Sequence, residues 1–358
     1  MRVDIVDTHT DQALLAATLQ QIFGEHCSPT DLRDAETTEW SDGCWQALDE
    51  AGLLRVGVAE AAGGSGGTLA DACTLAMVAG RHAVPLPVAE GSLLAAWFAD
   101  TGLELPPGVL TVAPVPHEPR LFLRDARVTG LVERVPWGAR ADAVLAVAES
   151  DSGPCAVVLD PARATCIPGR SLAGEPRDGL TWEGAEVADG CRSPVDPEAI
   201  AGLKLRGALA RTLMIAGAMQ RTAELSVAHA RSRTQFGRPI AAFQAVGHRL
   251  VQMRAETELV ALAAMVAARR FAEAGTDAWL EVGSAASVAA AAVIDVTKHA
   301  HQVHGAIGMT REYPLHHFTR RLWSWRYEWW TERRDAGQLG RQLVAVGAPS
   351  LWTRVAGY

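Results

Sequence analysis

The first hundred residues carry apolar side chains at helical spacing. One segment contains Leu14, Leu15, Leu19 and Phe23, and a second contains Trp45, Leu48 and Leu53. Apolar residues that recur every three or four positions predict amphipathic helices. A glycine-rich stretch at 63–67 follows, and a further helix is expected to start near Thr68, with Asp71 in its first turn. Because neither a Lys-Ser/Thr pair nor a preceding strand accompanies these glycines, we favour a plain loop over a phosphate cradle.

The hydrophobic period changes between residues 108 and 196. Short runs such as GVLTVAPV, RLFLRDARV, DAVLAVA and CAVVLD are rich in β-forming residues and are separated by Pro, Gly and Asp. Runs of this length with turn residues between them predict a small antiparallel barrel or sandwich. The sequence therefore predicts a β domain that interrupts a helical protein.

Long helical patterns return after Pro197. One apolar stripe comprises Phe243, Val246, Leu250, Met253, Thr257, Val260, Ala264, Ala267 and Phe271, which indicates a helix bundle. The Ala-rich stretch 276–300 is apolar on more than one side, as in a helix buried among others or at a subunit interface. We therefore predict an α+β chain with an N-terminal helical domain (1–107), a middle antiparallel β domain (108–196) and a C-terminal four-helix bundle (197–358).

Composition and charge narrow the classes of function. The 358 residues are 49% hydrophobic and 21% charged, as in an ordinary folded protein of two or three domains. A formal net charge of −8 disfavours a nucleic-acid-binding surface. The six cysteines have no regular spacing, so neither a disulfide framework nor a zinc site is expected. The start of the sequence lacks a leader pattern and no stretch of about 18 uncharged apolar residues occurs, so a cytoplasmic location without membrane contact is expected.

The first candidate for chemistry is the segment RSRTQFGRPI at 231–240, which joins two long predicted helices. Its three arginines, Arg231, Arg233 and Arg238, can hold a phosphate diester, while Gln235 and Gln244 offer neutral hydrogen bonds. This combination suits a dinucleotide. The alternative is a solvated basic helix end that compensates its own helix dipole.

The second candidate is the segment QVHGAIGMTREYP at 302–314. It predicts a helix that ends in small residues, where a ligand can approach the backbone closely. Taken alone, it is an ordinary helix C-terminus.

Together the two segments resemble the acyl-CoA dehydrogenase family. The pattern R-x-Q-F-G-x-P-I-x-x-F-Q, followed about sixty residues later by Q-x-x-G-x-x-G-x-x-x-E-Y-P, is similar to the family's FAD-binding pattern, and the α-β-α order agrees. The resemblance implies that the bundle of one subunit contacts the ADP part of an FAD held mainly by its neighbour. The residues implied in these contacts are Arg233, Gln235, Phe236, Ile240, Phe243, Gln244, Gln302, Val303, Gly305 and Ala306.

The chain departs from the family where the flavin ring is held. The family's T-E-P-x-A-G-S-D segment corresponds here to VAPVPHEPRLFLRD, and its W-I-T strand aligns with Arg134, Val135 and Pro136. Proline has neither an N–H nor a hydroxyl to offer. The resemblance therefore implies that this β domain holds a flavin ring poorly.

The catalytic base of the family is a carboxylate that removes the α-proton of the thioester. The resemblance suggests Glu328, within RRLWSWRYEWWTERRD, as the candidate, although a structural role in a Trp-rich helix is the alternative. A second family position for the base aligns with Ala210. The tryptophans at 323, 325, 329 and 330 are a substrate-facing wall or, more commonly, an interface. His299, His301 and His304 lack the spacing of a metal site.

These features resemble the smaller chain of heteromeric α2β2 acyl-CoA dehydrogenases that act on bulky steroid side-chain CoA thioesters. In that interpretation a larger partner subunit holds the flavin ring and the base, and an electron-transferring flavoprotein accepts the electrons. One alternative is a self-sufficient homotetramer that uses Glu328, with a ring pocket built from Arg134, Trp137 and the tryptophan cluster. Another is a flavin-free structural subunit.

Overall fold

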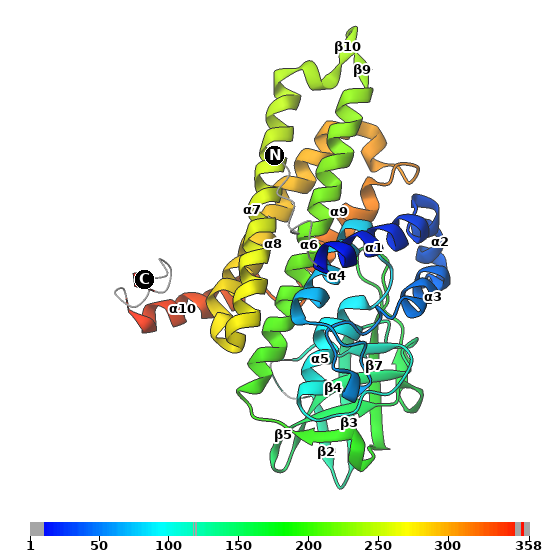
Figure 1. Cartoon of the computed structure of the whole chain (residues 1–358), viewed down its shortest axis with the longest axis vertical. Coiled ribbons are helices and arrows are strands. Elements are labelled where there is room, and N and C mark those ends of the chain that lie inside the picture. Colours follow the sequence, from blue (N-terminus) through cyan, green and yellow to red (C-terminus); the bar gives the residue numbers. More distant parts are fainter. Residues whose placement is uncertain (1–10, 117, 119, 348–351, 354–358) are drawn as a thin grey trace.

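The structure is a computed structural model that describes residues 11–116, 118, 120–347 and 352–353. The first ten residues, on which the expectation of a missing leader rests, lie outside the described part. Helices give way to strands between Asp100 and Leu110, and strands give way to helices between Pro194 and Ala199. Figure 1 shows the β domain at one end of an elongated molecule and the long helices extending away from it. The expected order of helical, β and helical segments is therefore present.

The described part of the N-terminal segment contains five α-helices. They are α1 (Asp11–His26), α2 (Pro29–Thr38), α3 (Asp42–Glu50), α4 (Leu69–His82) and α5 (Ala95–Asp100), and a π-helical turn, Glu90–Leu94, precedes α5. Thr68 caps α4, with its side chain and that of Asp71 each accepting from the other's backbone N–H, so this helix starts where the sequence predicted. Gly24 lies inside α1, and the break between α1 and α2 comes at Cys27 and Ser28.

The middle segment is a sheet with the strand order β6-β7-β3-β2-β4-β5-β8, and β1 pairs with β4. The strands are β1 (Leu110–Val112), β2 (Leu121–Arg124), β3 (Arg127–Pro136), β4 (Ala143–Ser150), β5 (Gly153–Leu159), β6 (Thr165–Ile167), β7 (Arg177–Glu186) and β8 (Arg192–Pro194). Most pairings are antiparallel as predicted, but β4 runs parallel to β1 and to β2. Parallel neighbouring strands need a crossover connection. Between β2 and β4 this connection contains β3 and residues 137–142.

The C-terminal segment is built on three long helices, α6 (Ala199–Ser232), α7 (Gln244–Ala274) and α8 (Trp279–His304). The shorter helix α9 (Leu315–Trp325) packs on α6 and α8, and α10 (Gly337–Val346) follows. The predicted stripe on α7 is buried from Met253 to Phe271, and most of the Ala-rich face of α8 is buried with it. The bundle therefore forms from the apolar pattern that predicted it.

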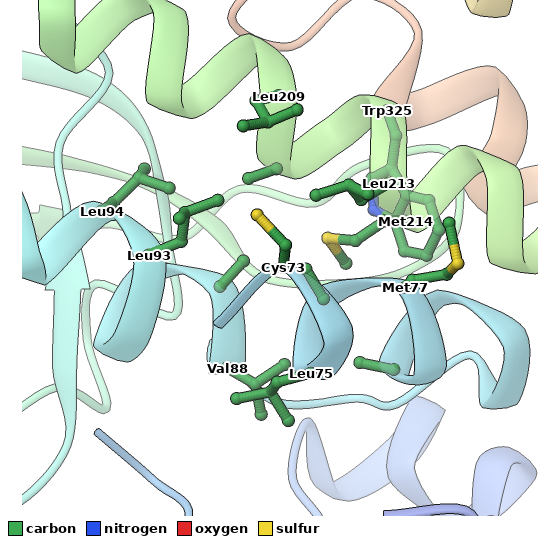
Figure 2. Close-up of a cluster of buried hydrophobic side chains, with 14 of the residues drawn as sticks. Cys73, Leu75, Met77, Val88, Leu93, Leu94, Leu209, Leu213, Met214 and Trp325 are labelled. Atoms are coloured by element: carbon green, nitrogen blue, oxygen red, sulfur yellow. The ribbon is translucent and has the colours of Figure 1, made fainter. Parts of the chain in front are cut away.

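One continuous core joins the N-terminal helices to the bundle. Figure 2 shows Met77 of α4 beside Leu213 and Met214 of α6 and Trp325 of α9. Helices α4 and α6 approach each other closely at Gly80. A Cβ on this residue would lie 2.1 Å from the carbonyl oxygen of Met214. Only glycine fits at this crossing.

One helical stretch among the described residues, 244–309, contains a window long and apolar enough to cross a membrane by length and composition. Its mean hydropathy is 1.5, and 61% of the window is buried inside the protein. The window falls in the α7–α8 hairpin, whose apolar faces form the bundle core.

Candidate functional site

The turn between α6 and α7 forms a small hairpin at the end of the bundle far from the β domain (Figure 1). Its strands are β9 (Thr234–Gln235) and β10 (Arg238–Pro239), and the turn residues Phe236 and Gly237 both have positive φ. A bulky residue rarely adopts that conformation, and the Phe236 side chain is 92% exposed. A strained, exposed aromatic side chain at a tip is a feature of binding surfaces.

The other residues predicted at this end are also on the surface. Arg233, Gln235 and Gln244 are exposed, and Ile240 and Phe243 are half-buried. The guanidinium of Arg238 lies 4.4 Å from the ring centroid of Phe243. The arginines and amides therefore face outward beside aromatic rings, an arrangement that can contact an anion and a flat base.

The second predicted segment lies at the end of α8. Gln302, Gly305 and Ala306 are exposed, and Gly305 has a φ of +62° where the helix ends. Val303 differs from its neighbours, because it is 4% exposed and packs into the protein. Only its backbone could contact a ligand.

Ring contacts bring the two segments to the same end of the bundle. The ring of His229, near the end of α6, stacks on that of His304, at the end of α8, with 4.6 Å between their centroids. Arg249 of α7 reaches His299 of α8 at 3.3 Å. Segments sixty residues apart are therefore neighbours in space.

The last residues of β3 and the tryptophan after it are buried. Val135 points into the β-domain core, and Pro136 is buried. Trp137 is 3% exposed, donates its indole N–H to the carbonyl of Glu39 at 2.9 Å, and packs under the guanidinium of Arg177. Trp137 is therefore committed to the domain interface.

Glu328 lies at the centre of a buried network of ion pairs. Its two carboxylate oxygens accept from Nε of Arg177 at 2.8 Å and from Nε of Arg211 at 2.7 Å. The side chains of Glu328, Arg177 and Arg211 are 8%, 3% and 4% exposed. Glu328 therefore neutralises two buried arginines.

The network extends from both arginines. Arg211 pairs with Glu90 of the N-terminal segment, and Arg177 pairs with Glu175 at 3.1 Å. Glu175 in turn accepts from Arg321 of α9 at 3.0 Å and from the indole of Trp325. We call this set the interdomain ion network, and its members are Glu90, Arg211, Glu328, Arg177, Glu175 and Arg321. Its acidic and basic members alternate and join all three segments of the chain.

The electrostatics of Glu328 are opposite to those of a general base. Burial alone raises the pKa of a carboxyl group, but the charges and hydrogen bonds of Arg177 and Arg211 lower the pKa of Glu328 to about 2. The two carboxylates that face Arg211 raise its pKa despite burial. A base for a weakly acidic carbon needs a pKa near the working pH.

The clustered tryptophans pack between elements. The ring of Trp329 covers α6 so closely that a Cβ on Gly207 would lie 2.1 Å from it. The indoles of Trp323 and Trp330 donate to Thr297 and Ser287 of α8. These side chains therefore pack against α6 and α8 of this chain, whereas the sequence had offered a substrate-facing wall or an interface.

The three histidines considered as ligands do not gather. His299 contacts Arg249, His301 contacts Thr319, and the Nδ1 atom of His304 lies 2.8 Å from the carbonyl of Ala300. Among the described residues, Glu36, His316 and His317 do have ligand atoms within 4.8 Å of one another. The Oε1 atom of Glu36, which lies 3.2 Å from Nδ1 of His317, also accepts a hydrogen bond from Arg320 at 3.1 Å. This carboxylate therefore already has a cationic partner.

Sequence reasoning did not find most of the interdomain ion network. Glu90 lies in the apolar run PVAEGSLLAAWF and Arg211 in ALARTLMIAGA. A lone charge in such a run is rarely buried without a partner. That signal marks each residue, although it does not identify the partner.

Comparison with known proteins matches both helical segments to domains of one protein family. Residues 9–102 match the family described as acyl-CoA dehydrogenase, N-terminal domain, and residues 205–326 match acyl-CoA dehydrogenase, C-terminal domain. The chain is 32% identical to the acyl-CoA dehydrogenase FadE34 of Mycobacterium tuberculosis over 75% of its own length, but it spans 38% of that relative. It is 28% identical to FadE27 of the same organism, covering 88% of this chain and 92% of the relative.

Solved structures agree with this assignment. A chain of the ChsE4-ChsE5 complex from Mycobacterium tuberculosis superposes with a TM-score of 0.87 and 26% identity, covering 96% of this chain and 100% of that one. The Tcur3481-Tcur3483 steroid ACAD variant has the same fold, with a TM-score of 0.83 and 24% identity over 94% and 98% of the two chains.

Proposed function

Because the chain belongs to the acyl-CoA dehydrogenase family of FAD-dependent oxidoreductases, we propose that it is the smaller subunit of a heteromeric α2β2 dehydrogenase. In this assembly the larger subunit holds the flavin ring and the catalytic base. The present chain supplies the wall that contacts the ADP part of FAD, with Arg233, Gln244 and Gln302 as its polar members. The substrate is a bulky, steroid-type CoA thioester.

The position of Glu328 is the observation that carries the proposal. A family base must be free to take a proton from the substrate, whereas Glu328 is held by Arg177 and Arg211 and has a pKa of about 2. Moving it toward a substrate would break its buried ion pairs with Arg177 and Arg211, and breaking a buried pair costs about 3–5 kcal/mol. We therefore give Glu328 the structural role and place the base in the partner.

The residues of this chain fit the two ends of FAD unequally. Exposed guanidinium and amide groups at the hairpin suit a pyrophosphate and an adenosine. At the other end, Pro136 has no donor and Trp137 is buried against Arg177. The FAD of this assembly would supply an acceptor for the hydride that leaves the β-carbon of the thioester. In this chain the retained groups bind and orient, and Glu328 is not free to move the substrate's proton.

The two alternatives account for fewer of these observations. A self-sufficient homotetramer would need Glu328 and Trp137 free to face a substrate, and both are committed to buried contacts. A flavin-free structural subunit leaves the exposed Arg233, Gln235 and Gln244 without a role, together with the strained Phe236.

The likeness to the ChsE4-ChsE5 complex and to a steroid ACAD supports the heteromer and the substrate class. An electron-transferring flavoprotein is the proposed acceptor, and the cytoplasm is the proposed location. Both follow from the family resemblance.

The experiment is to express the chain alone and together with the larger dehydrogenase subunit proposed as its partner. Flavin absorbance and native mass are then measured for both preparations. We expect the chain alone to lack flavin, and the co-expressed complex to be an α2β2 tetramer with about two FAD. A yellow homotetramer with about one FAD per chain would overturn the proposal in favour of a self-sufficient enzyme. A colourless heteromer that turns over no thioester would favour the structural subunit.

A further inference from the structure

Two cysteines meet in the N-terminal segment, far from the hairpin and the interdomain ion network in the sequence. Cys27 follows the last residue of α1, and Cys44 lies in the first turn of α3. All six cysteines are free thiols, and the Cys27 thiol donates to the sulfur of Cys44 with 3.9 Å between the two sulfur atoms. The two cysteines are 17 positions apart in the sequence, and α2 lies between them.

The surroundings give the two thiols different roles. Cys44 is fully buried, and the neighbouring Cys27 thiol together with burial raises the pKa of the Cys44 thiol. Cys44 is therefore the less reactive of the two thiols toward peroxide. Cys27 is 8% exposed, so it is the thiol that a small oxidant reaches first.

We propose that Cys27 and Cys44 form a reversible disulfide when the protein meets a small hydroperoxide such as hydrogen peroxide. A disulfide bond is about 2.05 Å long, so the sulfurs must approach by roughly 1.9 Å, which side-chain rotation can supply. This site is independent of the proposed function.

The reaction proceeds in two balanced steps. The sulfur of Cys27 attacks one peroxide oxygen, the O–O bond breaks, and the thiol proton leaves with the other oxygen as water, so that Cys27 becomes a sulfenic acid. The proton of the Cys44 thiol then passes to the sulfenic oxygen as the Cys44 sulfur attacks the sulfenic sulfur, the S–O bond breaks, and a second water leaves. The two thiols lose two electrons and two protons, and the peroxide is reduced to water.

The cross-link would close a loop around α2. That helix and the turn after it contact the rest of the chain, with Glu36 paired to Arg320 of α9 and Glu39 paired to Arg170 of the β domain. A disulfide restricts the unfolded state and the loop that it closes. Oxidation would therefore fix one of the helices through which the N-terminal segment contacts the other two.

The test is made on the full chain, in the oligomeric form in which it is purified. Protein is treated with hydrogen peroxide, quenched, denatured and alkylated, and its mass and peptides are compared with those of untreated protein. We expect four of the six cysteines to remain alkylatable, and a peptide pair joined through Cys27 and Cys44 that dithiothreitol separates. The thermal midpoint of the oxidised protein should rise and return on reduction.

Variants separate this pair from other thiols. Cys44→Ser should abolish the joined peptides and leave Cys27 as a sulfenic acid that dimedone traps. Cys166→Ser, at a half-buried cysteine on β6, is the matched control and should leave the joined pair intact. Six alkylatable cysteines after treatment, or joined peptides that involve other cysteines, would overturn the proposal. Because the peptide map is made on the unaltered chain, the result stands even where a variant fails to fold.

Discussion

At the residue scale, neighbours decide what a carboxylate does. Glu328 and a family base are the same residue type in a buried place, but Arg177 and Arg211 make this carboxylate a counter-ion. Two guanidinium groups at hydrogen-bond distance outweigh the effect of burial on its pKa. The residue therefore contributes to stability in place of proton transfer.

A first prediction concerns Glu328→Gln. The amide cannot neutralise Arg177 and Arg211, so we expect a loss of about 3–5 kcal/mol in the free energy of unfolding, measured by urea denaturation. Turnover per folded complex should stay close to that of the unaltered protein. Glu133→Gln, which breaks an exposed pair with Arg120, is the control and should cost less than about 1 kcal/mol. A loss of turnover of several orders of magnitude at unchanged stability would instead identify Glu328 as the base.

A second prediction concerns Arg233→Ala in the co-expressed complex. Removing a charged hydrogen bond to the pyrophosphate should weaken FAD retention by about 1.5–3 kcal/mol, a factor of roughly ten to a hundred in the dissociation constant. Equilibrium dialysis of FAD measures it. Arg269→Ala removes an exposed arginine near the other end of α7 and should leave FAD binding unchanged. Equal weakening by both variants would contradict a specific role for Arg233.

At the element scale, the crossing of α4 and α6 depends on glycine where each helix meets the other's backbone. A Cβ on Gly80 would lie 2.1 Å from the carbonyl oxygen of Met214, and a Cβ on Gly217 would lie 2.0 Å from that of Met77. Helix propensity alone favours alanine at both places. Close packing of the two helices decides against it.

A third prediction tests this balance. Gly80→Ala should lower the free energy of unfolding by about 1–3 kcal/mol, because the new methyl group meets backbone that cannot move alone. Gly247→Ala, near the start of α7 with no atom within 4 Å of the new Cβ, should be neutral or stabilise by up to about 1 kcal/mol. Thermal melts of the two variants give the comparison. A stabilised Gly80→Ala variant would show that the helices can separate at no cost.

At the scale of the whole molecule, buried titratable groups make the fold sensitive to acid. Burial and the charges of Arg81 and Arg221 lower the pKa of His82 from 6.5 to about 4. As the pH falls, His82 is therefore protonated in the unfolded chain before it is protonated in the folded one. The free energy of unfolding decreases as the pH drops from about 6.5 toward 4. Glu328 acts in the same direction at lower pH, because its pKa falls from 4.5 to about 2 and the unfolded state again takes the proton first.

A fourth prediction follows for the pH dependence of the thermal midpoint. The midpoint should decline below about pH 6.5, and His82→Gln should flatten the decline between about pH 6.5 and pH 4.5. His248→Gln, at an exposed histidine of α7, is the control and should leave the slope unchanged. An unchanged slope in the His82 variant would assign the acid sensitivity to other groups.

The sequence by itself determined the parts of the protein that follow from local periodicity. The start of α4 at Thr68, the long helices α6 and α7 and the β-rich middle are present as predicted, because capping residues and apolar spacing act within a few turns. It also supplied the surface set around Arg233 and Gln302, since those residues form a recognisable pattern along the chain. Their roles toward FAD stay predictions.

Only the tertiary structure decided what surrounds Glu328. Its partners Arg177 and Arg211 lie 151 and 117 residues away in the sequence, on strand β7 of the middle segment and on helix α6. The same holds for Val303, which belongs to a surface motif but is buried, and for the sulfur atoms of Cys27 and Cys44. Spacing along a chain predicts which face of a helix is apolar. It does not predict which distant charges that face will meet, because packing of whole elements brings those charges together.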